Sequence, residues 1–418
     1  MEVFVYDGIN PASIAFDLNP TGGSTCSNFR VINTKLYFSG YEGTYGNEMY
    51  EYDGINPPVR ISDICVGCNS IPHDFTYFNN KIYFAANGPG NDNELYVYDF
   101  INPPSLVFDI NVTGSSYPND LTLFNNKLYF SATDGVNGRE LWQYNGVANP
   151  SLFFDFNEIT NDGNPAFLKV SNGILYFSAT DGATGVEPWK YDGISNPTMV
   201  ADLELGSGSS NPRYFFEFDS RLWFNGTITG FGQELVSYNG LVEVYDVNPG
   251  AIGSDPRYFT LYANEIYFRA TEVTTGREIW KTDGTQPTLV ADVNSGTSSS
   301  SSDWNLSTKK SMVVLGNNLI FGADNGIVGE ELFKFNSTAG LTDNSVLSYI
   351  NLHPNPTLNH VTINSNNSID KVEIYATSGE LIQTEFTTDF SVALISSGMY
   401  LVKVYTSQGI NTLRLIKE

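Results

Sequence analysis

Basic residues are scarce in this chain. Its 418 residues include 21 Lys and Arg against 46 Asp and Glu, which gives a formal net charge of −25. A phosphate backbone is bound by clustered Lys and Arg, so this composition argues against a nucleic-acid partner. It also argues against electrostatic docking on anionic lipid. Cationic partners or Ca²⁺ remain open, although general acidity more often serves solubility.

Long apolar runs and standard catalytic motifs are also missing. No run of about 18 apolar residues occurs, so no membrane span is expected. The opening "MEVFVYDGINP" lacks the basic and apolar segments of a secretory signal. Three cysteines are too few for a disulfide framework. The sequence has no nucleophile elbow, phosphate loop, dinucleotide fingerprint or HExxH. No catalytic, metal or cofactor site can therefore be assigned from motifs.

An internal repeat dominates the sequence. The phrase "GRELWQYNG" (138–146) returns along the chain at spacings of 44 to 53 residues. Its glutamates are Glu2, Glu48, Glu94, Glu140, Glu187, Glu234, Glu278 and Glu331. A second phrase, "FDIN" in one copy, repeats an aspartate at Asp17, Asp63, Asp109, Asp155, Asp202, Asp246 and Asp292. Each period contains four short β-rich runs, such as "LTLFNNKLYFSAT", which turns at Asn125-Asn126, followed by "ELWQYNG" and "PSLFFDF".

A four-stranded period of this length predicts a β-propeller rather than a helical repeat. We expect an all-β chain with seven blades. Residues 1–19 supply only a third and a fourth strand, whereas residues 304–336 supply a first, second and third. The two ends are therefore expected to complete one shared blade, although the third strand is then present once too often.

The repeat resembles a known family. "REIWKTDGTQPTLVADVNSG" (277–296) looks like the ELWxxDGT repeats of large secreted bacterial proteins, which are thought to form β-propellers. The resemblance covers residues 1–336 and is strongest in the repeats ending at Gly146, Gly193 and Gly284. It departs from the pattern where Val236 replaces Trp and Phe100 replaces the turn Gly.

A different pattern follows the repeats. We expect the propeller over 1–336, a polar linker over 337–349 and a small immunoglobulin-like β-sandwich over 350–418. The sandwich is indicated by the alternating runs "VEIYAT", "MYLVKVYT" and "NTLRLIKE" between Ser-Gly and Gln-Gly turns.

This tail is similar to the C-terminal sorting domain of the type IX (Por) secretion system of Bacteroidetes. The matching pieces are "HPNP" (353–356), "VEIYATSGELI" (372–382), "LISSGMYLVKVYT" (394–406) and a terminal Lys-Glu pair. The motif residues are Pro354, Asn355, Pro356, Gly379, Gly398 and Tyr400. The resemblance implies recognition by the secretion machinery of a Gram-negative bacterium, export, cleavage of the tail, and release or surface attachment.

Such clients first cross the inner membrane on a signal peptide, which this sequence does not show. Together with a start in the middle of a blade, this indicates an N-terminally truncated sequence. The alternative is a gene fragment or misassigned start that is never exported.

The repeated acids are expected to belong to the scaffold, because a group present in every blade answers a demand of every blade. Glu140 would accept N–H groups of the preceding turn, Asp134 to Gly138, and the repeated aspartates would do likewise in the loops that follow. The alternative is a ring of glutamates lining the channel and binding cations. Ca²⁺ at the Asp-Gly turns is disfavoured, because the oxygen ligands of a calcium loop are more densely spaced.

Blade-specific residues are better candidates for function. Cys65 and Cys68 are expected to form a loop disulfide; zinc would need His73 and Cys26 as further ligands. Arg213 and Arg257 share the phrase "PRYF" and could hold a carboxylate or an anionic sugar, although a surface or stacking role is the simpler interpretation. Trp304 lies outside the repeated tryptophan position and is a candidate for ligand stacking.

The first hypothesis for function is an exported or cell-surface monomer whose propeller is a non-catalytic binding or adhesion module for a glycan or a protein. The alternatives are a polysaccharide lyase or glycosidase with its site over the central channel, and a structural spacer in a larger surface protein. An enzyme would bring together acids, His or Arg unique to particular blades, whereas a lectin would expose blade-specific aromatic side chains.

Overall fold

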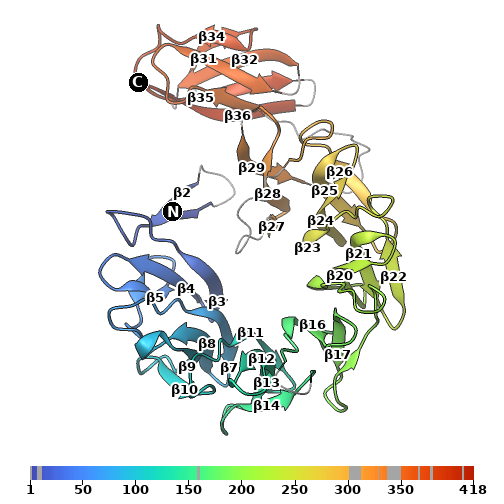
Figure 1. Cartoon of the computed structure of the whole chain (residues 1–418). Helices are drawn as coiled ribbons and strands as arrows, with labels where there is room; N and C mark the ends of the chain where they lie inside the picture. Colours follow the sequence, from blue (N-terminus) through green and yellow to red (C-terminus); the bar gives the residue numbers. More distant parts are fainter. Residues whose placement is uncertain are drawn as a thin grey trace. The chain divides into compact units, whose positions relative to one another are not determined.

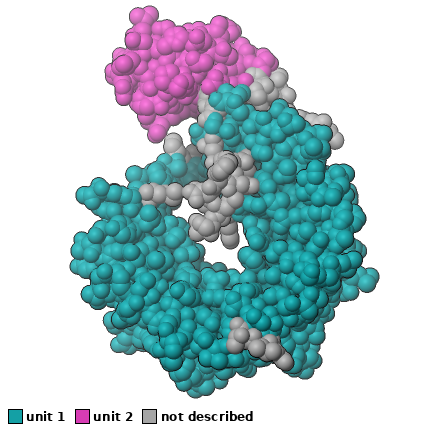
Figure 2. Space-filling view, in the orientation of Figure 1, with its two compact units in different colours: residues 1–333 teal, residues 334–418 magenta. Residues whose placement is uncertain are grey.

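The structure is a computed structural model that describes residues 2–6, 12–157, 161–300, 312–327, 329–336, 350–365, 368–376, 380–406 and 409–418. The chain divides into two compact units, unit 1 from Met1 to Phe333 and unit 2 from Lys334 to Glu418 (Figure 2). Trp304, Gly379 and the expected linker 337–349 lie outside the described residues.

In its described residues, unit 1 contains six four-stranded antiparallel sheets, each made of strands that follow one another in sequence. The first three sheets consist of β3 (Ser27–Ile32), β4 (Lys35–Glu42), β5 (Gly46–Tyr52) and β6 (Val59–Arg60); β7 (His73–Phe78), β8 (Lys81–Asn87), β9 (Asn93–Tyr98) and β10 (Ser105–Phe108); and β11 (Asn119–Phe124), β12 (Lys127–Thr133), β13 (Arg139–Tyr144) and β14 (Ser151–Phe154). The next three consist of β15 (Ala166–Ser171), β16 (Ile174–Thr180), β17 (Val186–Tyr191) and β18 (Thr198–Met199); β19 (Arg213–Phe218), β20 (Arg221–Ile228), β21 (Gly232–Tyr238) and β22 (Val242–Tyr245); and β23 (Arg257–Tyr262), β24 (Glu265–Glu272), β25 (Gly276–Thr282) and β26 (Thr288–Ala291). A 3₁₀ helix, η1 (Pro89–Asn91), lies in the connection between β8 and β9 of the second sheet.

Two partial sheets flank these six. A hairpin of β1 (Val3–Val5) and β2 (Ser13–Phe16) precedes them, and a three-stranded sheet of β27 (Met312–Leu315), β28 (Asn318–Asp324) and β29 (Glu330–Phe335) follows. Within the described residues the two pieces form separate sheets, so the shared blade expected from the sequence is not seen there. Six complete blades and the β27–β29 sheet make seven, and the β1–β2 hairpin packs on the first complete sheet, with the Phe16 and Phe38 ring centroids 5.2 Å apart.

The first strand of each sheet is innermost. β3, β7, β11, β15, β19, β23 and β27 contact one another in chain order, and the later strands of each sheet lie successively farther out. Figure 1 shows the sheets of unit 1 following one another in this order around a centre. Unit 1 is therefore a β-propeller of four-stranded blades, as the repeat predicted.

Aromatic side chains form the core between neighbouring sheets. The Tyr83 and Tyr144 ring centroids lie 5.5 Å apart, although β8 and β13 belong to different sheets. Phe156 and Trp189 meet in the same way at 5.1 Å. Trp189 is only 8% exposed, so the repeated tryptophan position serves packing. Adjacent aromatic residues, such as Tyr129 and Phe130 in β12, point to opposite faces of the sheet and suit strands that are covered on both faces.

Unit 2 is a two-sheet β-sandwich. One sheet contains β30 (Ile350–His353), β31 (His360–Ser365) and β34 (Asp389–Ser391); the other contains β32 (Ile369–Ala376), β33 (Leu381–Glu385), β35 (Gly398–Thr406) and β36 (Gly409–Lys417). Val361 and Phe390 of the first sheet share a buried core with Val372, Val402 and Leu415 of the second.

Candidate functional site

The repeated glutamates of the six complete sheets are fully buried and bind the backbone of the loop that follows their blade, whereas Glu331 is exposed. Glu140 accepts N–H bonds from Phe156 (2.9 Å) and Gly163 (2.6 Å). Glu187 accepts the equivalent bonds from Leu203 (3.0 Å) and Ser210 (2.9 Å). The scaffold role as a backbone acceptor is therefore confirmed. The expected donors were wrong, because the turn before Glu140 is closed by Asp134 itself, whose Oδ1 accepts the N–H groups of Val136 and Asn137.

A serine that was not recognised from the sequence completes all but one of these contacts. In five of the six complete blades a buried serine, Ser70, Ser116, Ser210, Ser254 or Ser300, donates its N–H or its hydroxyl to the preceding repeated glutamate. Gly163 takes this position after Glu140, because a Cβ there would lie 2.5 Å from Glu140 Oε2. We call this pair of residues the Glu–Ser link.

The backbone of the serine, or of Gly163 at the same position, also binds the next blade. The carbonyl oxygen of Ser116 accepts the N–H of Thr133, at the end of the second strand of the following sheet, at 3.0 Å. Gly163 and Thr180 repeat this bond at 2.9 Å, and Ser210 and Thr227 at 2.8 Å. Each Glu–Ser link therefore joins one blade to the next. A ring of glutamates lining the channel is ruled out for these buried residues.

Burial perturbs the linked glutamates. Desolvation is the main cause that raises the pKa of Glu140, Glu234 and Glu278 to about 7, opposed by the hydrogen bonds they accept. The charge of the neighbouring repeated aspartate raises the pKa of Glu140 further. Five repeated aspartates are partly buried, and their Oδ1 atoms have no hydrogen-bond partner in the described residues: Asp63, Asp109, Asp155, Asp202 and Asp246.

One group of acids has a geometry that could suit a cation. Ligand oxygens of Asp92, Glu94 and Asp109 all lie within 4.8 Å of one another. However, both oxygens of Glu94 already accept bonds from the loop, from Ile110 N at 3.1 Å and from Ser116 N at 2.8 Å. This group is therefore a variant of the Glu–Ser link with one additional carboxylate.

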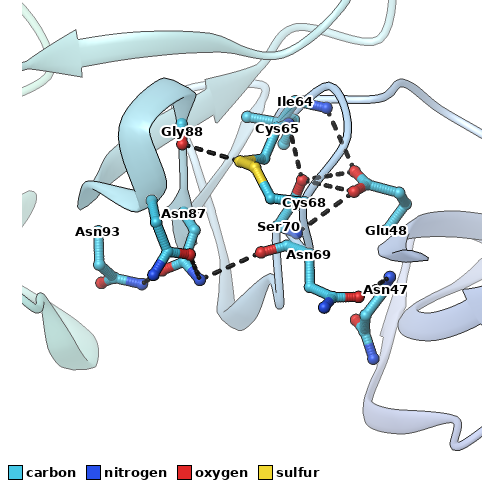
Figure 3. Close-up of a disulfide and its surroundings, with 11 residues drawn as sticks. Asn47, Glu48, Ile64, Cys65, Cys68, Asn69, Ser70, Asn87, Gly88 and Asn93 are labelled. Carbon is cyan, nitrogen blue, oxygen red and sulfur yellow. Dashed lines mark hydrogen bonds between the residues drawn. A yellow bond between two sulfur atoms is a disulfide. The ribbon is translucent and has the colours of Figure 1, made fainter. Parts of the chain in front are cut away.

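Cys65 and Cys68 form a disulfide across a short loop segment, with Cα atoms 5.2 Å apart. Figure 3 shows this bond beside the Glu48–Ser70 link, where Cys65 N donates to Ser70 Oγ at 3.0 Å. Cys26 is free, and burial is the main cause that raises the pKa of its thiol to about 12. The disulfide therefore constrains the loop that carries the serine.

A polar cavity of about 440 Å³ lies at the start of three consecutive first strands, β7, β11 and β15. It is lined by His73, Asn93, Tyr117, Pro118, Asn119, Ser131, Arg139, Asn164, Pro165 and Ala166. Its volume is within the usual range of small-ligand sites. The lining combines amide, hydroxyl, imidazole, guanidinium and aromatic groups. These groups come from several different repeat positions.

The repeat explains why the lining residues differ from one another. His73, Asn119 and Ala166 are equivalent positions at the start of the first strand, as their pairing with Ala85, Ser131 and Ser178 shows. The cavity therefore lies where the repeat is broken.

Tyr117 and Asn164 project from a backbone conformation that recurs in each blade. Both have positive φ, 46° and 47°, and so do Ile71 and Asn211 at the same repeat position. Because this conformation occurs whichever residue is present, it belongs to the scaffold. At Tyr117 it leaves the side chain 56% exposed at the edge of the cavity.

Arg139 is the cation of the cavity. Its Nη1 donates to the carbonyl oxygen of Tyr117 at 2.9 Å and to Ser131 Oγ at 2.7 Å. Arg139 thereby fixes the turn that presents Tyr117. Arg139 was not singled out from the sequence because it lies inside the repeated phrase, and His73 was considered only as a further zinc ligand.

The sequence-selected arginines do not line this cavity. Arg257 is paired with Asp255, whose Oδ1 accepts from Nε at 2.9 Å, and Arg277 binds the same carboxylate at 2.8 Å. Arg213 is exposed and lies over the Phe167 ring, 5.7 Å from its centroid. Arg213 and Arg257 begin consecutive first strands, but they have different partners, because Arg257 forms an ion pair with Asp255 and Arg213 lies over the Phe167 ring. Trp304 lies outside the described residues.

In unit 2 the HPNP segment is attached to the last strand. Asn355 Nδ2 donates to the carbonyl oxygen of Arg414 at 2.7 Å, and Asn355 Oδ1 accepts the N–H of Ile416 at 2.8 Å. The peptide bonds before Pro354 and Pro356 are cis. Tyr400 Oη donates to the carbonyl oxygen of Ser396 at 2.8 Å, close to Gly398. These residues build the sandwich and its C-terminal edge.

Solved structures similar to the chain are distant. A puromycin-hydrolyzing peptidase of Mycobacterium tuberculosis is 10% identical with a TM-score of 0.48, and the match covers 79% of this chain and 56% of that one. The extracellular domain of a putative hybrid two-component system of B. thetaiotaomicron is 12% identical with a TM-score of 0.45, covering 94% and 55%. A prolyl endopeptidase is 10% identical with a TM-score of 0.46, covering 91% and 54%. The chain spans little more than half the length of these proteins. No curated protein matches its sequence.

The tail gives a more specific match. Residues 351–418 match the family model of the secretion system C-terminal sorting domain. Among the described residues, no helix is long and apolar enough to cross a membrane. The sorting domain indicates that the protein is exported through type IX secretion to the cell surface or the extracellular space.

Proposed function

We propose that the exported protein is a non-catalytic binding module that holds a glycan in the polar cavity of its propeller. The observation that carries the proposal is Tyr117, an aromatic side chain 56% exposed at the edge of a cavity lined by amides. Aromatic rings next to polar groups suit sugars, because the ring covers the apolar face of the sugar while amides bind its hydroxyl groups.

One blade-specific aromatic residue supports this proposal. Tyr117 is replaced by Ile71 and Asn164 in the neighbouring blades. Phe167, which follows the lining residue Ala166, is also exposed, but an aromatic residue recurs at its position in the next two blades as Tyr214 and Tyr258. An exposed aromatic residue that breaks the repeat, as Tyr117 does, distinguishes a lectin from a spacer, which needs only the repeated residues.

We also propose a family for the repeat, an oligomeric state and a bacterial source. We infer that the repeats are of the ELWxxDGT type and that the parent protein is a monomer from a Bacteroidetes bacterium. Each part of the phrase has a structural role that supports this inference. Glu140 accepts the N–H of Gly163 in the loop after its blade, Trp142 packs between sheets, and the side chain of Asn145 closes its own turn. The secretion machinery recognises unit 2, and the glycan ligand belongs to the propeller.

Glycan binding is tested with the full chain on an array of polysaccharides and oligosaccharides, followed by calorimetry. Tyr117→Ala should lower affinity for the captured glycan at least about fivefold, because a ligand-stacking aromatic contributes on the order of 1–3 kcal/mol. Tyr77→Ala is the matched control, since Tyr77 is 38% exposed and lies outside the cavity. Equal losses in both variants, or no captured glycan, would contradict the proposal. Release of shortened saccharides during the assay would instead identify an enzyme.

Export is tested separately. Deletion of residues 350–418 from the full-length gene should keep the product inside the cell. Continued export of the deleted form would overturn the role of the tail.

A further inference from the structure

We propose that the polar cavity takes neutral saccharides and disfavours acidic ones, because carboxylates around Arg139 keep its surroundings negative. This inference rests on the proposed glycan binding and adds the charge class of the ligand. It also names Asp162 as the residue that sets this selectivity.

The lining of the cavity contains one residue with a permanent charge, Arg139. An isolated guanidinium would favour an acidic sugar, since Arg binds carboxylates through paired N–H groups. Here Nη1 is committed to Tyr117 O and Ser131 Oγ, so the fork of N–H groups is already partly used.

Three carboxylates are placed next to lining residues. Asp74 follows His73, Asp120 follows Asn119, and Asp162 lies two residues before Asn164. Backbone bonds hold them at this edge of the propeller. Asp120 N donates to Asp74 Oδ2 at 2.5 Å, and Phe167 N donates to Asp120 Oδ2 at 2.6 Å. Arg139 N donates to Asp162 Oδ1 at 2.7 Å.

Two of these carboxylates, Asp162 and Asp120, act on Arg139 directly. Burial lowers the pKa of the guanidinium, and the charges of Asp162 and Asp120 raise it. The pKa of Asp120 rises to about 6, mainly through burial and then through the charge of Asp74. The positive charge of the cavity is therefore already opposed by carboxylates of the protein itself.

A uronic acid would add another carboxylate to this set. Repulsion by one uncompensated charge at a distance of several ångströms weakens binding about three- to thirtyfold, depending on the local dielectric. A neutral sugar avoids this cost and still finds the amides of Asn119 and Asn164 and the ring of Tyr117. The net charge of −25 acts in the same direction at long range.

The test compares neutral and acidic oligosaccharides of equal length on the full chain by calorimetry. The neutral probes are gluco-, manno- and xylo-oligosaccharides, and the acidic probes are oligogalacturonates and oligomannuronates. The wild-type protein should bind a neutral probe more tightly than every acidic one. Asp162→Asn keeps an oxygen acceptor for Arg139 N but removes the charge, so it should tighten binding of acidic probes about three- to thirtyfold. Affinity for the neutral probe should stay within about twofold.

Asp134→Asn is the matched control. It makes the same change in net charge and also retains an acceptor for Val136 N and Asn137 N, in a turn outside the cavity lining. Equal shifts in the two variants, or a wild-type preference for acidic probes, would overturn the inference. Tyr117-dependent binding without charge discrimination would overturn the inference but leave the proposed function intact. Absence of binding to both probe classes would overturn both.

Discussion

Replacing Glu140 by alanine removes the equivalent of one Glu–Ser link, in which Gly163 takes the place of the serine, from the middle of the propeller. Phe156 N and Gly163 N then lose their acceptor at a site where Glu140 is 0% exposed. A buried donor left without a partner costs about 1–3 kcal/mol, so the two N–H groups together cost about 2–6 kcal/mol.

Part of this loss is offset. The pKa of Glu140 is raised to about 7 by burial, so its ionised form is unfavourable in the folded protein and its removal brings some relief. The net destabilisation should therefore be about 2–4 kcal/mol, a large share of the 5–15 kcal/mol typical of a folded domain.

Urea unfolding at neutral pH, followed by tryptophan fluorescence, measures this change. Glu331→Ala is the matched control, because Glu331 occupies the same repeat position in β29 but is exposed, and it should change the free energy of unfolding by less than about 0.5 kcal/mol. Similar values for the two variants would refute the view that burial and backbone acceptance, rather than repeat position, give the glutamates their role.

Three further predictions concern pH, the disulfide and the tail. The buried glutamates whose pKa is raised to about 7 stabilise the fold most below about pH 4.5 and lose this contribution as pH rises through 7. The free energy of unfolding should therefore fall between about pH 5 and 8, by on the order of 3 kcal/mol per group. A rise of the unfolding free energy over this interval in urea titrations would contradict the prediction. Cys65→Ser with Cys68→Ser should cost about 2 kcal/mol, because the disulfide spans a sequence separation of only 3; an unchanged urea midpoint would show that the loop is fixed by Ser70 alone. Asn355→Ala removes two hydrogen bonds to β36 and should destabilise unit 2 by about 1–2 kcal/mol and reduce export from the producing cell. Normal export of this variant would show that the secretion machinery does not depend on the HPNP motif.

The repeat made the fold predictable. Residues with the same surroundings in each blade, such as Glu140 and Trp189, recur at a fixed spacing, so counting them identified both the blade and its scaffold acids. The serine of each Glu–Ser link also recurs, 22 residues after Glu48 and Glu94. It was overlooked because it lies in loops of different composition, "CVGCNS" and "NVTGSS", where serine is unremarkable.

The cavity could not be found in the same way. His73, Asn119 and Ala166 are equivalent in the repeat and have no chemistry in common, so only the contact of three neighbouring first strands brings them into one site. The sequence pointed to departures from the repeat as the place to look for function, and the cavity lies at such departures. It selected Arg257 among them because a guanidinium suggests an anion, but the pairing with Asp255 depends on the fold of the turn.

The Glu–Ser link makes each repeat a self-contained module for duplication. Glutamate and serine lie within one repeat length, so copying one period also copies the bond that attaches the new blade to its neighbour. The outermost turns take no part in these bonds: Ile55, Val147 and Ile194 at their tips are 87%, 89% and 91% exposed. New chain ends or inserted peptides at these tips would leave all the blade-to-blade joints intact, which makes the propeller a scaffold that can be permuted or extended one period at a time.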